Sequence, residues 1–157
     1  MPVDEQLAIV GRLALAAALG AFIGLERELR GYPAGVRTVA LVALGAALFT
    51  DVSQLLGGED RVAAGIVTGI GFLGAGVIFR EGYTVRGITT AATIWSAAAV
   101  GMAIGRELYL AAGLGSLLIF LLLEARPVVR RMDDFVRGRL REAVAREEQG
   151  EERDNDD

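Results

Sequence analysis

Apolar residues form five long stretches in this chain, and charged residues gather in the short segments between them. The clearest stretch lies between Arg61 and Arg80, where 18 consecutive residues carry no charge. Because a helix rises about 1.5 Å per residue, a stretch of this length nearly crosses a hydrocarbon core of about 30 Å. It therefore predicts a membrane-spanning helix.

The other apolar stretches predict four further spans, over residues 7–25, 36–56, 87–104 and 108–123. Short turns with glycine or charged residues separate them, so neighbouring helices run antiparallel. We expect an all-α fold: a polytopic membrane helix bundle of about five transmembrane helices within residues 1–124. Composition supports this, because 53% of the 157 residues are hydrophobic, too large a share for one small soluble core.

The pattern changes after the fifth stretch. Between residues 125 and 146, apolar side chains such as Met132, Phe135 and Leu140 recur at helical spacing with arginines between them. This pattern predicts an amphipathic helix on the cytoplasmic membrane surface. Residues 147–157 are mostly acidic and predict a disordered tail.

Basic residues are unevenly distributed between the two ends of the expected helices. All 16 are Arg, and 13 of them lie in the turns after the first and third spans or beyond the fifth span. The turns at the opposite end contain only Arg61 and Arg106. The positive-inside rule therefore places the N-terminus outside and the C-terminus in the cytoplasm.

Small residues mark the faces along which the helices are expected to pack. Between membrane helices, glycines remove side chains and allow backbones to touch. The first, third and fourth spans carry such faces and the fifth is rich in Leu, so we expect the third helix at the centre of the bundle and the fifth against lipid. The GxGxxG spacing within the third span is not a dinucleotide-binding turn, because its flanks are apolar. The expected packing positions are Gly20, Gly24, Gly65, Gly69, Gly71, Gly74, Gly76, Gly101 and Gly105.

Two charged residues, Arg12 and Asp51, stand inside apolar stretches. Antiparallel helices place them at similar depth, in the outer half of the membrane. A charge within a membrane helix suggests a functional site by default, but three explanations remain open. The residues form a structural pair, or Asp51 serves a cation or proton, or Arg12 extends its side chain to the interface alone.

The absence of Cys and His limits the chemistry that is open to this chain. Disulfides, thiolate or imidazole metal sites and catalysis by these side chains are excluded. The acidic residues show no motif with a base or nucleophile, so we expect no enzyme. We expect no cofactor, with Mg²⁺ as the one exception that oxygen ligands allow; its weak candidates are Asp51, Glu59 and Asp60. A solvated acidic turn is the simpler explanation of the last two.

A second group of charges lies at the cytoplasmic end. Glu26, Arg27 and Arg37 come from the turn after the first span, and Glu81 and Arg86 from the turn after the third. Arginine suits bidentate pairing with carboxylate or phosphate. These residues are explained either by topology and local salt bridges or by a docking surface for lipid headgroups, a nucleotide or a partner protein.

The fourth span contains several hydroxyl residues, with Thr89 and Ser96 as candidates for a polar pathway. Hydroxyls in membrane helices also bond to carbonyls of their own helix or to a neighbour. Plain packing therefore explains them as well.

Several segments closely resemble the MgtC/SapB family of bacterial inner-membrane proteins: GRLALAAALGAFIGLERE at residues 11–28, GVRTVALVALGAALF at 35–49 and GIGFLGAGVIFREGYTVRGITTAATIW at 69–95. The resemblance covers about residues 7–123. It implies a multi-pass protein of the inner membrane, with a role linked to magnesium limitation or acid stress. For the virulence-associated branch it also implies interaction with the F-type ATP synthase.

The resemblance marks Glu81, in the REG motif, as a functional position. In the virulence-associated branch we expect Asn and Cys where this chain has Thr89 and Ser96. These differences favour a short SapB-like member.

Two functions therefore stand side by side. In the first, a non-enzymatic helix bundle modulates Mg²⁺, acid-stress or membrane ion homeostasis through protein or ion contacts. In the alternative, the protein transports a cation or small solute along the third and fourth helices and Asp51. In both cases we expect the lipid bilayer as a partner and no nucleic acid. A membrane protein such as the F-type ATP synthase and a second copy of the chain are the candidate protein partners.

Overall fold

The computed structural model describes residues 1–57 and 59–125, with the backbone alone at residues 59, 60 and 81. Residues 1–121 form one compact unit, and residues 122–157 are a second unit. The expected amphipathic helix and acidic tail lie outside the described residues, apart from residue 125. The description below concerns the first unit.

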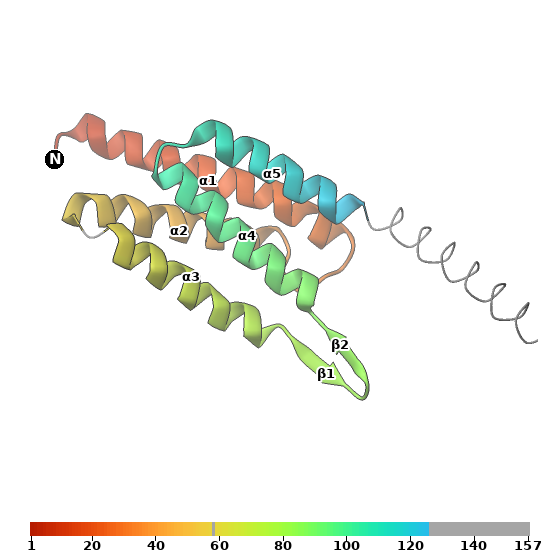
Figure 1. Ribbon diagram of the computed structural model, residues 1–157. Coiled ribbons are helices and arrows are strands. Elements are labelled where there is room, and N and C mark those ends of the chain that lie inside the picture. The colour runs from red at the N-terminus through yellow and green to blue at the C-terminus, as the bar shows by residue number, and fades with distance from the viewer. Residues whose placement is uncertain (58, 126–157) are drawn as a thin grey trace, which may run out of the picture. The chain divides into compact units, whose positions relative to one another are not determined.

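The described chain contains five helices and one short β-hairpin (Figure 1). Successive helices run in opposite directions, as the short turns predict. The expected all-helical bundle is confirmed, with the hairpin as an addition. The elements are α1 (Val3–Leu29), α2 (Val36–Leu56), α3 (Glu59–Gly76), β1 (Phe79–Glu81), β2 (Thr84–Arg86), α4 (Ile88–Gly105) and α5 (Tyr109–Glu124).

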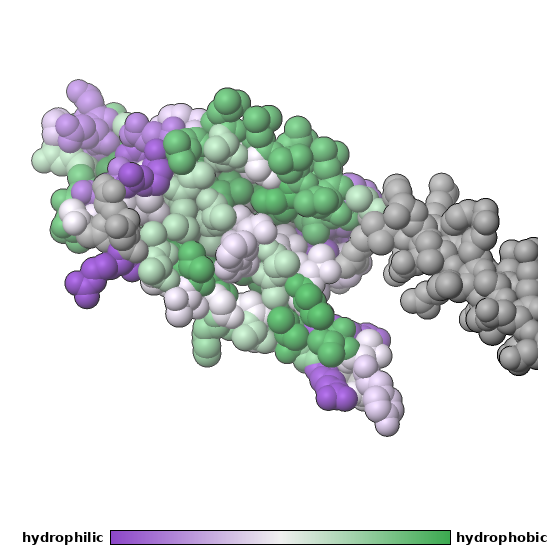
Figure 2. Space-filling model, viewed as in Figure 1, coloured by the Kyte–Doolittle hydropathy of each residue, from purple (hydrophilic) through white to green (hydrophobic). Residues whose placement is uncertain are grey.

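Three of these helices, α1, α2 and α4, are long and apolar enough to cross a membrane, while α3 and α5 are apolar over shorter lengths. Large hydrophobic side chains such as Leu7, Phe22, Leu41 and Leu118 are exposed on the helices. Figure 2 shows hydrophobic residues over α5, with hydrophilic residues near the start of α1 and at the hairpin. An apolar exterior between polar ends is the surface that a bilayer requires.

Helix α2 is the element against which α1 and α4 both pack. A Cβ atom at Gly20 of α1 would lie 2.7 Å from the Val39 carbonyl oxygen, and one at Gly101 of α4 would lie 2.9 Å from the Ala43 carbonyl carbon. Gly24 approaches Val36 in the first turn of α2 equally closely, and Gly105 approaches Ala47 and Thr50. Both neighbours therefore touch the α2 backbone because they carry no side chain at these positions.

Helix α3 lies at the edge, so the prediction that it occupies the centre is wrong. A Cβ atom at Gly65, Gly69, Gly71 or Gly76 would meet nothing within 4 Å, and one at Gly74 would make only ordinary contact, 3.5 Å from the Ala91 Cβ atom. The helix packs instead through Val62, Ile66 and Ile70, beside Ala46 and Ala98. Glycine spacing shows that a helix can be approached closely, but larger side chains on another face make the contact here.

The turn after α3 also differs from expectation, because the helix ends at Gly76 rather than continuing to residue 79. The chain then forms the hairpin, in which Phe79 pairs with Arg86 and Glu81 with Thr84. Gly82 has a positive φ of 61° in the connecting turn. Gly87 has a φ of 90°, and a Cβ atom there would collide with the Val77 carbonyl oxygen. These two glycines allow the hairpin to turn and to join α4.

Replacing Gly101 by Leu should greatly reduce accumulation of the protein in the membrane, because the side chain would enter the α2 backbone at Ala43. Overpacking of this kind costs about 1–3 kcal/mol or more. The matched control is Gly71→Leu, at a position of α3 that faces open space. Protein amounts and thermal unfolding in detergent measure both variants, and equal loss in the two would contradict the central position of α2.

Candidate functional site

Two polar clusters connect the helices of the bundle. The Asp51 cluster comprises Arg12, Asp51 and Glu107, and the Arg27 cluster comprises Glu26, Arg27, Arg30, Tyr32 and Thr90. Arg27 follows Arg12 by 15 positions along α1, which at about 1.5 Å per residue is about 22 Å. The clusters therefore lie at opposite ends of the bundle.

In the Asp51 cluster, Arg12 of α1 pairs with Asp51 of α2. The Arg12 Nη2 and Nε atoms lie 2.7 and 2.9 Å from Asp51 Oδ1. Side-chain exposure is 16% for Arg12 and 3% for Asp51, so the pair is largely removed from solvent. The prediction that these residues meet is confirmed, and Arg12 does not extend to the interface alone.

Glu107 joins this cluster from the turn between α4 and α5, a contact that was not predicted from the sequence. Arg12 Nη1 lies 2.9 Å from Glu107 Oε1, and the Glu107 side chain is 62% exposed. Glu107 has a positive φ of 60°, a conformation that is uncommon outside glycine. One arginine thus bridges a buried carboxylate and an exposed one.

Asp51 also retains an acceptor that the pair does not use. Within the described part of the chain, Asp51 Oδ2 and Ser53 Oγ are buried and have no hydrogen-bond partner. A buried carboxylate oxygen without a partner is costly and can accept a proton, a water molecule or a cation. The structural pair therefore does not by itself rule out the cation or proton role.

The Arg27 cluster is buried, contrary to its expected place at an open turn. Glu26 and Arg27 are each 1% exposed. Arg27 Nη2 donates a hydrogen bond of 2.8 Å to Thr90 Oγ1 on α4, and the Arg27 Cζ atom lies 3.8 Å from the Tyr32 ring centroid. This bond and this cation–π contact hold the end of α1 against α4 and the following turn.

Glu26 supplies the negative charge of the Arg27 cluster. Its Oε1 atom lies 2.8 Å from Arg30 Nε, and its Oε2 atom lies 3.7 Å from Arg27 Nη1. A carboxylate between two guanidinium groups satisfies the rule that a buried charge must be paired.

Helical spacing could have identified the burial of Arg27. The buried positions Ala16, Gly20, Ile23 and Gly24 precede it at steps of three and four residues, so Arg27 continues the packing face of α1. Thr90 likewise begins the buried face of α4. Tyr32 follows the end of α1, so helical spacing does not predict its contact with Arg27.

Arg37, in contrast, is exposed in the first turn of α2. Together with Tyr32 and Thr38 it lines a hollow of about 490 Å³. Glu28 lines the same hollow, and its Oε2 atom accepts a hydrogen bond of 2.7 Å from the Val36 backbone N–H. This carboxylate stabilises the N-terminus of α2, where the helix dipole favours negative charge.

The remaining residues that the sequence marked as candidates lie in the hairpin before α4 or within α4 itself. Glu81 and Arg86 belong to the two strands of the hairpin, which precedes α4 (Figure 1). Thr89 is exposed and Ser96 is half-buried. The Thr89 carbonyl accepts a hydrogen bond of 2.8 Å from Thr93 Oγ1, a bond within one helix.

Metal-binding groups are sparse. Among the described residues, no group of three or more His, Cys, Asp or Glu side chains could hold a metal ion. Glu59 and Asp60 begin α3, and their side chains are not described.

Comparisons with known proteins identify a family. The family model described as "MgtC family" matches residues 13–132. An uncharacterized protein of Synechocystis is 47% identical over 128 residues, which are 80% of this chain and 53% of that relative. Protein MgtC of Brucella abortus is 57% identical over 99 residues, 61% of this chain and 42% of the relative.

Protein MgtC of Salmonella typhimurium is 55% identical over 95 residues, 59% of this chain and 41% of the relative. The chain thus spans about half the length, or less, of these curated relatives. No solved structure matches the chain.

A double-mutant cycle tests the Asp51 cluster. Arg12→Ala should lower the free energy of unfolding by about 3–5 kcal/mol, because it leaves the buried Asp51 carboxylate without its cation. Arg12→Ala with Asp51→Ala should cost less than Arg12→Ala alone. Denaturant titration in detergent measures these values, with Glu107→Ala as an exposed control that should cost about 0–1 kcal/mol. A coupling energy near zero would show that the pair does not form.

A second prediction concerns the Arg27 cluster. Thr90→Val keeps the side-chain shape but removes the acceptor for Arg27, so it should destabilise the protein by about 1–3 kcal/mol. Thr89→Val is the matched control at the neighbouring exposed position and should change stability by less than about 0.5 kcal/mol. The same unfolding titration compares them, and indistinguishable curves would refute the buried contact.

Proposed function

The chain belongs to the MgtC family, and we propose that it modulates Mg²⁺ or acid-stress homeostasis through contacts with a partner protein rather than by transport or catalysis. It is a membrane protein with apolar helices. We further propose that all five helices cross the bacterial inner membrane, with the Asp51 cluster toward the outside and the hairpin toward the cytoplasm. No resident metal or cofactor is required for this function.

One observation carries the proposal: two of the buried charged residues, Arg27 and Asp51, are engaged in contacts between helices. Arg12 joins α1 to α2, and Arg27 joins α1 to α4. A transport path needs polar groups that can exchange partners with a solute, whereas these groups support a fixed scaffold. Hydroxyls elsewhere in the bundle bond to carbonyls of their own helices, at Thr50, Thr68, Thr93 and Ser116.

The hairpin is the surface that we assign to the partner. Tyr83 is fully exposed at its tip, and Phe79 and Val85 are each about half exposed. Arg80 and Arg86 are exposed beside them. Aromatic and arginine side chains together are the composition of protein interfaces. The F-type ATP synthase is a candidate partner through the family resemblance.

A specific observation favours the alternative of a cation or proton carrier. Asp51 Oδ2 is buried without a hydrogen-bond partner in the described part of the chain. If Arg12 released Asp51, the carboxylate would be free to bind a cation or proton. Transport would then depend on Asp51 rather than on the hairpin.

Complementation tests the role of the hairpin. In a strain that lacks the protein and grows poorly at low Mg²⁺, Glu81→Ala and Arg86→Ala should fail to restore growth while accumulating to normal amounts. Arg106→Ala, at the opposite end of the bundle, is the matched control and should restore it. Full growth with Glu81→Ala would contradict the proposal.

Reconstitution separates the two functions. Vesicles that contain the purified protein should show no Mg²⁺ or proton flux above protein-free vesicles. A flux that Asp51→Asn abolishes, with the protein still folded, would instead establish the carrier.

A further inference from the structure

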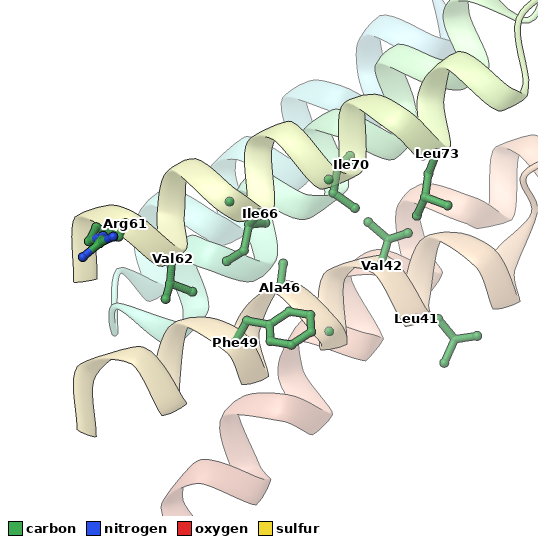
Figure 3. A pocket seen from close by; sticks show the side chains of 12 residues that line it. Leu41, Val42, Ala46, Phe49, Arg61, Val62, Ile66, Ile70 and Leu73 are labelled. Carbon is green, nitrogen blue, oxygen red and sulfur yellow. The ribbon is translucent and has the colours of Figure 1, made fainter. Parts of the chain in front are cut away.

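A groove of about 690 Å³ runs between α2 and α3 (Figure 3). Val42 and Phe49 line it from α2, and Val62, Ile70 and Leu73 line it from α3. Among the residues whose side chains the structure describes, Arg61 near the start of α3 is the one charged residue that lines it. This volume lies within the range of about 300–1,000 Å³ that is typical of ligand sites.

The glycines of α3 explain why the groove is open. Gly65 and Gly69 lie along it, as does Gly45 of α2, and a Cβ atom at any of these positions would meet nothing within 4 Å. Ile66 holds α3 beside Ala46 of α2. The two helices are thus held together while space remains beside their contact.

The length of the groove matches one leaflet of a bilayer. Arg61 and Leu73 are 12 residues apart along α3, which at about 1.5 Å per residue is about 18 Å. Half of a hydrocarbon core of about 30 Å is about 15 Å. With Arg61 at the membrane interface, the apolar lining therefore reaches about as far as an acyl chain from that side.

We propose that this groove binds one anionic phospholipid, with an acyl chain along the α3 glycines and the phosphate at Arg61. The charge at one end complements a phosphate, to which an arginine can donate paired hydrogen bonds. The apolar walls accept only the hydrocarbon part of such a molecule. The proposal requires that α3 lies in the bilayer and does not depend on the role of the hairpin.

A second copy of the chain is the competing occupant, because glycines on a membrane helix also favour helix pairing. In a two-fold dimer about the membrane normal, Arg61 and its symmetry mate would lie at the same depth near the interface. Like charges placed together oppose association. A phosphate at Arg61 instead neutralises the charge, so the lipid is favoured.

Native mass spectrometry of the delipidated protein, titrated with phosphatidylglycerol or phosphatidylcholine, tests the proposal. The wild type should prefer phosphatidylglycerol by about fivefold, the effect expected for one arginine near a membrane surface. Arg61→Gln should remove this preference, and Arg106→Gln, in the turn between α4 and α5, should keep it. Gly69→Leu should block binding of both lipids, and Gly71→Leu, on the same helix but outside the groove lining, should not.

Three outcomes would overturn the lipid site. They are an unchanged preference in Arg61→Gln, an equal effect of Gly69→Leu and Gly71→Leu, and a lipid-free dimer that only Gly69→Leu dissociates. If Gly69→Leu fails to fold, the lipid preferences of Arg61→Gln and Arg106→Gln still test whether the groove binds an anionic lipid at Arg61.

Discussion

Close backbone contact between α2 and the glycines of α1 and α4 is the constraint on which the rest of the structure depends. A Cβ atom at Gly20 would lie 2.9 Å from the Ala43 Cβ atom, and one at Gly101 would lie 2.9 Å from the Ala43 carbonyl carbon, so neither position has room for a side chain. Once α1 and α2 are this close and antiparallel, Arg12 and Asp51 meet at one end. At the other end, the packing of both α1 and α4 against α2 brings Arg27 of α1 to Thr90 of α4. The two charged clusters are therefore consequences of packing as well as supports for it.

This arrangement separates two kinds of surface on one small bundle. The faces of α1, α2 and α4 that meet are closed by glycines and paired charges. The hydroxyls of Thr50, Thr68, Thr93 and Ser116 donate to carbonyls of their own helices. What remains open is the hairpin, with its exposed Tyr83, and the groove beside α3. These features favour a protein that acts through contacts at its surface over one that transports a solute through its interior.

The sequence predicted the helices and the Arg12–Asp51 pair, because hydropathy gives the spans and antiparallel spans fix the depth of each residue. It did not predict which helix is central. Glycines occur on α1, α3 and α4 alike, and their spacing does not show which of them faces a neighbour. Burial of Arg27 was missed because charges at a turn resemble solvated ones, and Glu107 was missed because it approaches Arg12 only through the tertiary fold. The hairpin depends on two glycine conformations that hydropathy does not register.

Nuclear Overhauser measurements on protein in nanodiscs, with labelled alanine methyl groups, test the central position of α2 most directly. The methyl group of Ala43 should give cross-peaks to the α-protons of Gly20 and Gly101, and none to those of Gly69 or Gly71. Strong cross-peaks from Ala43 to the α3 glycines, with none to Gly101, would contradict the arrangement and restore α3 to the centre of the bundle.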